Sequence, residues 1–261
     1  MNMKNVSIIY HKDLREIMTL RTVKYSMIIF PVLFLSILLF ILYFSYLNLG
    51  SSSNIPDYFN NTLKAVPYSS NGKIFYYLSM NYLIFLSIVP LSLASTISSY
   101  SVVGEKQQKT IEPILATPID DREFFLGKLL APLFPTLGIT YVVIAIYSIF
   151  SDLISIHFNY IIYPNISWAI VVFLFIPFST ILMVLLTLLF SSKAVDPRSS
   201  QQFSAIILIP ILVVFFLSML IYSIESILLL LLTAIVIIGD FLLFRITVKI
   251  FDRETIVTRW K

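Results

Sequence analysis

Long apolar runs alternate with shorter polar stretches along the whole chain. Six runs reach the roughly 20 residues that a helix needs to cross the hydrocarbon core of a bilayer. They lie at about 25–49, 76–103, 129–151, 168–191, 203–222 and 227–248. Strands of a membrane barrel would instead alternate apolar and polar residues over about ten positions, and these runs do not. The pattern predicts an all-α membrane protein whose residues 1–261 form a single transmembrane domain with six transmembrane helices.

The connections and the prolines add detail to this prediction. Only residues 223–226 separate the last two runs, so these runs form either a tight helical hairpin or a pair in which one member is re-entrant. Prolines lie within or near the ends of the runs at positions 31, 90, 132, 135, 177 and 210. Kinks at these positions are expected to be tolerated where neighbouring helices shield the freed carbonyl groups.

The composition agrees with a membrane protein and excludes several kinds of chemistry. The chain is 58% hydrophobic and 12% charged, with a mean hydropathy of +0.92, whereas soluble domains carry about 25% charged residues. It contains no cysteine and only two histidines, His11 and His157. This excludes disulfides and cysteine-ligated metals, and we expect no metal site.

The basic residues predict the orientation of the chain. Sixteen of the 18 Lys and Arg residues fall before the first run, between runs two and three, between runs four and five, or at the end of the chain, and only Lys64 and Lys73 fall on the opposite side. By the positive-inside rule, both termini are cytoplasmic, including a tail at 249–261, and the chain is a multi-pass protein of the cell membrane. The net charge of +4 therefore reflects topology, and no nucleic-acid binding is expected.

Residues 1–24 precede the first run and have an amphipathic pattern. Leu14, Ile17, Met18 and Arg21 recur at helical spacing, and most of the basic residues lie elsewhere on the wheel. The pattern predicts a cytoplasmic amphipathic helix at the membrane interface. An ordinary positively charged flank is the alternative.

The chain lacks groups that would power transport. A phosphate-binding P-loop needs a glycine five residues before a Gly-Lys pair. Gly72-Lys73 and Gly127-Lys128 are preceded at that position by Pro67 and Arg122. We therefore expect a non-enzymatic subunit that binds no cofactor itself and depends on a partner for energy.

Asp240 is the one carboxylate well inside a run. Ionisable residues within membrane spans commonly mark transport pathways, so Asp240 is a candidate for a substrate or proton site. The alternative is a packing residue that hydrogen-bonds a neighbouring helix or interfacial water.

The stretch 104–128 between runs two and three is patterned for a partner. Thr110 is a candidate N-cap, Ile111, Ile114 and Leu115 share one helical face, and Thr117-Pro118 ends the helix. Asp120 and Glu123 have the spacing of a capping box that starts the next helix. A short helix with an exposed apolar face suits docking into a groove of another protein. A helix resting on lipid is the alternative.

Three segments of the chain resemble those of the type-2 ABC (ATP-binding cassette) exporter permeases. The first segment lies within 105–128 and consists of Glu105-Lys106, Thr110-Ile111-Glu112, Leu115, Thr117-Pro118 and Gly127-Lys128. The second is the link Asp196–Gln202, and the third is the tail Arg253–Lys261. The first resembles the coupling-helix signature of the family, and together the three cover the chain from end to end.

The resemblance implies a half-transporter. A separate ABC ATPase subunit would bind ATP and Mg and receive the coupling helix in a cleft, and a second permease copy or homologue would complete a dimer. The residues implied to contact the ATPase are Glu105, Thr110, Ile111, Glu112, Ile114, Leu115, Thr117 and Pro118. ATP binding would then drive alternating access of the spans.

Two other functions remain as alternatives. One is a secondary transporter or channel that needs no ATPase, and the other is an ABC-type permease that transmits force or signals without transport. Two histidines at opposite ends of the topology argue against a membrane-embedded lipid-processing enzyme. The sequence leaves open the substrate and whether the permease pairs with itself or with a homologue.

Overall fold

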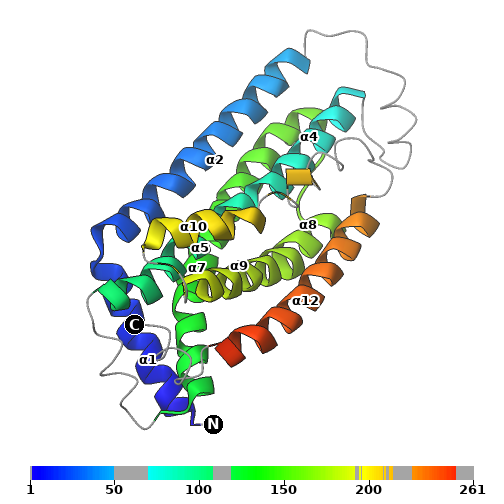
Figure 1. Cartoon of the computed structure of the whole chain (residues 1–261). Coiled ribbons are helices and arrows are strands. Elements are labelled where there is room, and N and C mark those ends of the chain that lie inside the picture. Colours follow the sequence, from blue (N-terminus) through cyan, green and yellow to red (C-terminus); the bar gives the residue numbers. More distant parts are fainter. Residues whose placement is uncertain are drawn as a thin grey trace.

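The computed structural model describes residues 2–49, 70–107, 119–191, 194, 196–207, 209, 212–213 and 225–250. Within these ranges the chain is helical and contains no β-strand, as the apolar runs predict. Five helices in these ranges are long and apolar enough to cross a membrane. They pack side by side as an elongated bundle (Figure 1).

Five of the six predicted runs correspond to these helices. The first is α2 (Arg21–Leu49), and the second is α4 (Ser70–Leu86) followed by α5 (Ile88–Gln107). The third is α7 (Asp121–Ser155), and the last is α12 (Glu225–Ile250). The fourth run contains α8 (Ile166–Ile170), the π-helical η2 (Val171–Phe175) and α9 (Ile176–Ser191).

The predicted fifth run, 203–222, lies largely outside the described residues. Its beginning follows α10 (Pro197–Ser204) and the 3₁₀ turn η3 (Ala205–Ile207). Asp196 caps α10 by accepting a 2.6 Å hydrogen bond from the Ser199 backbone N–H, which lowers the pKa of the Asp196 carboxyl. Pro197 occupies the first turn, where a missing N–H breaks no intrahelical bond.

Two spans are interrupted close to a proline. α4 and α5 are separated at Ser87, three residues before Pro90, whose missing N–H leaves the Leu86 carbonyl without an α-helical donor. The Ser87 hydroxyl donates to the Ile84 carbonyl at 2.6 Å. The π-helical η2 similarly ends just before Pro177. Pro31, Pro132 and Pro135 lie within continuous helices.

The helices differ in how deeply they are buried. The span formed by α4 and α5 is central: 72% of its most apolar stretch is buried inside the protein. Only 17% of the most apolar stretch of α12 is buried. α5 packs against α2, α7, α9 and α10. α2 and α12 lie at the perimeter and expose apolar side chains such as Phe40, Ile235 and Ile238. Such faces suit contact with lipid.

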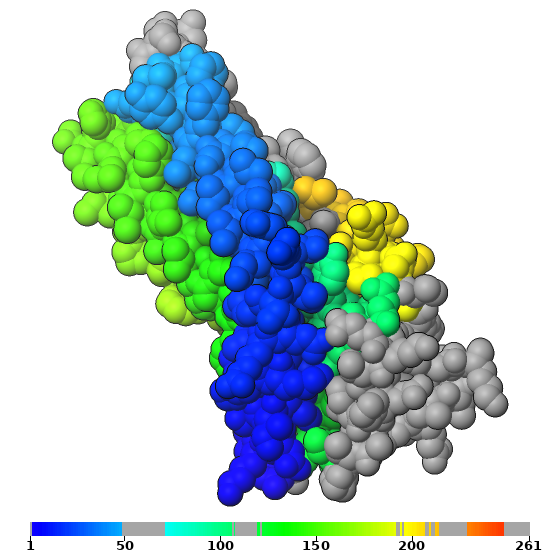
Figure 2. Space-filling view, turned by 90° about the vertical axis from the view of Figure 1, so that its left-hand side faces the viewer, coloured from blue at the N-terminus to red at the C-terminus, as the bar shows by residue number. Residues whose placement is uncertain are grey.

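α1 (Met3–Thr19) precedes the first span and is a helix, as predicted. Its buried residues, Val6, Ile9, Asp13 and Ile17, recur at intervals of three or four and form one face. This face packs mainly against α7 and also contacts α5. Figure 2 shows α1 and α2 following one another along one face of the molecule, with α7 beside them. The apolar stripe of α1 is therefore covered by protein.

At the other end of the bundle, tyrosines fasten α4 to its neighbours. The Tyr147 hydroxyl of α7 donates to the Ser79 carbonyl at 2.8 Å, and the Tyr163 hydroxyl donates to the same carbonyl at 3.1 Å. Tyr160 donates to the Gly72 carbonyl at 2.6 Å. These contacts hold α4 against α7 and the segment that follows it.

Asp152 shapes that same segment. After α7 the chain makes the 3₁₀ turn η1 (Ile156–Phe158) and passes through Asn159, which has a φ of 60°. The Asp152 carboxylate accepts hydrogen bonds from the backbone N–H groups of Ile162 and Tyr163, at 2.9 and 3.0 Å. One side chain at the end of α7 thus holds the backbone that leads to α8.

Candidate functional site

The best-defined polar site lies where α1 meets the end of α5 and the start of α7. These two helix ends flank the stretch 104–128 that the sequence singles out. Gly127 allows the close approach, because a Cβ atom there would lie 2.6 Å from Cγ2 and 2.7 Å from Cβ of Ile9. Phe124, Phe125 and Leu129 bury their side chains in the same apolar cluster as Ile9. Sequence-distant elements therefore meet at a tightly packed contact.

Lys128 is at the centre of this contact and is fully buried. Its ammonium Nζ lies 3.0 Å from Oδ2 of Asp13 on α1 and 2.7 Å from Oε2 of Glu105 on α5. It also donates to the Ser101 carbonyl at 3.3 Å and lies 5.2 Å from the centre of the Phe124 ring. One lysine thus pairs with carboxylates from two other helices.

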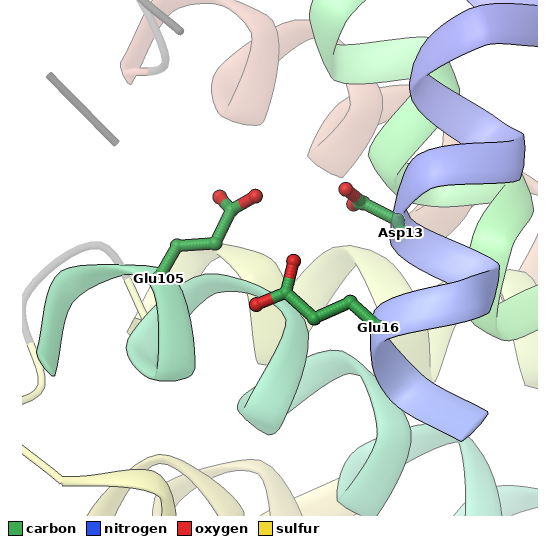
Figure 3. Close-up of side chains that lie close together, drawn as sticks. All are labelled: Asp13, Glu16 and Glu105. Atoms are coloured by element: carbon green, nitrogen blue, oxygen red, sulfur yellow. The ribbon is translucent and has the colours of Figure 1, made fainter. Parts of the chain in front are cut away.

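The two carboxylates are also buried and have further partners. Asp13 is 2% exposed and Glu105 is 1% exposed. Asp13 accepts a 3.1 Å hydrogen bond from the Ser101 hydroxyl. Lys12 donates to Glu105 and lies 3.5 Å from Glu16. We call Lys12, Asp13, Glu16, Glu105 and Lys128 the ion cluster; Figure 3 shows its three carboxylates directed toward one another from α1 and α5.

The three carboxylates of the ion cluster resemble a metal-binding group. One oxygen from each of Asp13, Glu16 and Glu105 lies within 4.8 Å of the others. However, the Lys128 ammonium already lies within hydrogen-bonding distance of two of them, and Lys12 contacts all three residues. Since these ammonium groups supply the positive charge, the arrangement favours an ion-pair network over a metal site.

A buried ion pair is costly to break, because each charge then lacks its partner in an apolar environment. Desolvation offsets much of the attraction within a buried pair, but removal of one partner leaves a buried charge and costs about 3–5 kcal/mol. Asp13, Glu105 and Lys128 belong to three different helices. Separation of any of these helices from the others would expose or strand a charge. The ion cluster therefore holds α1, α5 and α7 as one unit.

A second polar contact joins the beginning of α1 to the beginning of α7. The Glu123 carboxylate accepts hydrogen bonds from the Asn2 backbone N–H and, at 2.7 Å, from the Asn5 side-chain amide. Asp120 is the N-cap residue of α7, as predicted, but its side chain makes no capping hydrogen bond. The predicted capping box is therefore only half formed: Glu123 accepts a hydrogen bond from the Asp120 backbone, but the reciprocal bond from the Asp120 side chain is missing.

The structure places only part of the predicted partner-binding set. Glu105 is described and belongs to the ion cluster. The other predicted contact residues lie outside the described part of the chain: Thr110, Ile111, Glu112, Ile114, Leu115, Thr117 and Pro118. The coupling-helix assignment thus stays a prediction.

Sequence reasoning missed the roles of Asp13 and Lys128. Asp13 lies on the apolar stripe of α1, between Ile9 and Ile17. Lys128 lies within an apolar stretch at the start of the third run. A charged residue on an apolar face is usually paired with another charge. Asp13 and Lys128 are opposite charges in such positions, so the sequence could have indicated that they pair.

Asp240 is apart from the ion cluster and differs from it in character. It is 8% exposed, and neither carboxylate oxygen has a hydrogen-bond partner within the described part of the chain. The packing alternative, in which Asp240 would hydrogen-bond a neighbouring helix, finds no such bond among the described residues.

A comparison with family models decides the family. A model described as ABC-2 family transporter protein matches residues 7–250. The chain belongs to this family. The match includes most of α1, the whole 104–128 stretch and α12, so it covers the ion cluster and Asp240 in one type-2 ABC permease. Searches of curated proteins and of solved structures gave no significant match for the permease.

Proposed function

We propose that this permease is the membrane-spanning subunit of an ATP-driven exporter in the cell membrane. A separate ABC ATPase subunit would dock on the 104–128 loop from the cytoplasm and supply ATP and Mg. A second permease copy or homologue would form a dimer with this chain. Alternating access of the spans would then carry substrate out of the cytoplasm.

Membership of the family supports the assignment as an ABC permease. The ion cluster supports the transmission of movement from the ATPase to the membrane helices. Glu105 and Lys128 lie at the two ends of the 104–128 loop, 2.7 Å apart. Asp13 ties the same lysine to α1. A force applied to the loop would reach α5 and α7 together, and α1 would move with them. This geometry would let a docked ATPase move several helices by a single contact.

The permease would contribute no catalytic group to ATP hydrolysis. Its Gly-Lys pairs lack the preceding glycine of a P-loop, and its Gly127-Lys128 pair is engaged in packing with Ile9 and pairing with Asp13 and Glu105. Lys128 would therefore act in mechanical coupling. The hydrolytic chemistry would belong to the partner.

The test is to purify the tagged permease from membranes in mild detergent and measure the ABC ATPase that accompanies it. The coupling variant I114E/L115E places charge on the predicted docking face. We expect it to lose the co-purified ATPase. A matched control, I161E/I166E, adds the same charge at two exposed isoleucines at the opposite end of the bundle and should retain the partner.

Two results would contradict this proposal. One is full ATPase pairing by I114E/L115E. The other is transport by liposomes that contain the permease alone, driven by an ion gradient without nucleotide, which would instead indicate the secondary-transporter alternative.

A further inference from the structure

Asp240 is a carboxylate within a candidate membrane span. It lies in the apolar helix Leu229–Thr247, seven residues before Thr247. At a rise of about 1.5 Å per residue, this places it roughly 10 Å from that end of the span. It is 92% buried, since its exposed fraction is 8%, and neither of its oxygens accepts a hydrogen bond from any residue that the structure describes.

Asp240 faces the interior of the bundle. The buried residues of α12 are Leu229, Thr233, Asp240 and Thr247, which fall on one helical face, whereas Phe241 is exposed. The hydroxyl groups of Thr233 and Thr247 donate to carbonyls of their own helix, at 2.8 and 2.7 Å. On the inward face of α12, the two threonine hydroxyls therefore have hydrogen-bond acceptors, whereas the Asp240 carboxylate has no donor among the described residues.

Among the residues that the structure describes, no cation from the elements that pack against this face pairs with Asp240. α12 contacts α9 most extensively, followed by α8 and η2, and none of these three contains an ionisable residue. α12 contacts α7 more sparsely. Of the two cations of that helix, Arg122 is exposed and Lys128 already pairs with Asp13 and Glu105. Arg245 of α12 itself lies 4.3 Å from the centre of the exposed Phe241 ring.

The undescribed part of the predicted fifth run offers no cation by sequence either. Residues 205–224 contain no Lys, Arg or His. A buried carboxylate without a partner is costly in an apolar environment and is usually neutralised or paired. Because neither the described helices around Asp240 nor residues 205–224 supply a cation, a positively charged ligand would be the natural partner for Asp240.

The surroundings distinguish between kinds of cation. Packing beside Asp240 is tight and apolar, since a Cβ on Gly239 would lie 2.9 Å from Cδ1 of Leu182 on α9. The nearest part of the apolar core includes Val236 and Leu243, one turn to either side of Asp240. Metal cations such as Ca²⁺ require about six to eight oxygen ligands, or several waters in the case of Mg²⁺. A single carboxylate among apolar side chains instead suits an organic cation. Its charge would pair with the carboxylate, and its hydrocarbon part would contact the apolar side chains.

We propose that Asp240 is a binding site for a monovalent organic cation, and that the cargo of the permease carries such a group. This inference rests on the proposed transport function. Asp240 would form the ion pair with the cationic group, and the inward faces of α12 and α9 would contact its apolar portion. Binding would require α12 to shift relative to α9, because Asp240 is buried in this structure.

The test measures binding of two cations, tetraphenylphosphonium and the smaller tetraethylammonium, to the full-length permease in detergent without any ATPase. The variants are Asp240→Asn, which removes the charge at constant size, and Asp240→Glu, which retains it. Asp152→Asn is the matched control, because the Asp152 carboxylate already accepts two backbone hydrogen bonds. We expect at least one probe to bind about tenfold or more weakly to Asp240→Asn, the size of effect expected for loss of one charged pair. Asp240→Glu and Asp152→Asn should bind like the original chain.

Thermal unfolding separates this role from a structural one. Asp240→Asn removes an unpaired buried carboxylate, so we expect an unchanged or higher midpoint, as for other functional residues held at a cost to stability. Equal binding of both probes to the original chain and Asp240→Asn would overturn the proposal. Binding of radioactive Na⁺ that depends on Asp240, without such binding of either organic probe, would also overturn it.

The binding experiment does not depend on the ATPase. Loss of probe binding in Asp240→Asn would support this inference whatever the coupling variant shows. Conversely, intact ATPase pairing with no Asp240-dependent binding would reject the cation site alone and leave the proposed transport function standing.

Discussion

The Lys128 ammonium lies 3.0 Å from the Asp13 carboxylate, and both side chains are almost completely excluded from solvent. The two residues are separated by 115 positions in the sequence. Their contact connects the helix before the first span to the beginning of the third. Since Glu105 pairs with the same lysine, three helices share one buried cation.

Loss of that cation should destabilise the permease strongly. Lys128→Met keeps most of the side-chain volume but leaves Asp13 and Glu105 as buried charges beside the exposed Lys12 alone. We expect a loss of about 3–5 kcal/mol of unfolding free energy, measured as a lower thermal midpoint in detergent. Lys12→Met is the comparison: its side chain is 40% exposed, and Lys128 still pairs with both buried carboxylates, so we expect a smaller loss than for Lys128→Met.

Neutralising the whole buried core of the ion cluster should restore stability. In Lys128→Met/Asp13→Asn/Glu105→Gln no buried charge remains unpaired, so much of the loss should be recovered. We expect ATPase coupling to remain impaired, because the three helices are no longer tied by charge. Full coupling in the stable triple variant would contradict the assigned role of the ion cluster.

Gly127→Ala should disturb the packing of α1 on α7. The added methyl group would lie 2.6 and 2.7 Å from Ile9 atoms and 3.3 Å from the Val6 carbonyl oxygen. We expect a cost of about 1–3 kcal/mol, typical of overpacking, and partial rescue by Ile9→Ala, because the two sites are in contact. Thermal unfolding of the single and double variants measures both effects.

Gly138→Ala provides the matched control in the same helix. No neighbouring atom lies within 4 Å of the position of its Cβ, so alanine should stabilise α7 by about 0.5–1 kcal/mol through helix propensity. A similar loss of stability at Gly127 and Gly138 would show that the contact with Ile9 is not the cause.

Glu123→Ala should loosen the beginning of α1 without freeing its remainder. The Asn2 backbone and the Asn5 side chain lose their acceptor, whereas Asp13 keeps its contact with Lys128. We expect faster amide hydrogen exchange over the first two turns of α1 and little change around Asp13. Uniformly faster exchange along the whole of α1 would indicate that the two contacts are not independent.

Asp152→Ala should act on the segment that follows α7. The backbone N–H groups of Ile162 and Tyr163 lose their acceptor, which costs about 1–3 kcal/mol when such groups stay buried. Hydrogen exchange at these two amides should accelerate, with no effect on α1. Unchanged exchange at both amides would mean that water replaces the carboxylate without loss of order.

The sequence predicted most of the fold because the apolar runs are long and nearly free of charge. Five runs correspond to helices, and for 227–248 and α12 both ends agree within two residues, whereas α7 begins eight residues before the predicted start at 129. The π-helical η2 and the break at Ser87 were less accessible. Pro31 and Pro132 lie in continuous helices while Pro90 and Pro177 adjoin irregular segments, so a proline alone does not determine the local outcome.

The candidate site was predicted less well, because it depends on contacts between distant segments. Glu105 was identified as part of a partner-binding set, but its pairing with Lys128 and Asp13 arises only when α1 packs against α7. The same packing gives Glu123 of the Asp120–Glu123 pattern further partners on α1, in addition to the Asp120 backbone. Local spacing could identify a helix start at Asp120, but it could not show that α1 engages Glu123.

The interruption at Ser87 divides the most buried span into two rods with separate attachments. α5 is fastened through Glu105 and Ser101 to the helices around Lys128, whereas α4 is fastened through the Ser79 and Gly72 carbonyls to tyrosines at the opposite end. Because the backbone ladder is discontinuous between them, a tilt of the first rod need not be carried rigidly into the second. Bending would concentrate at this joint, so the two halves of the most buried span can tilt by different amounts.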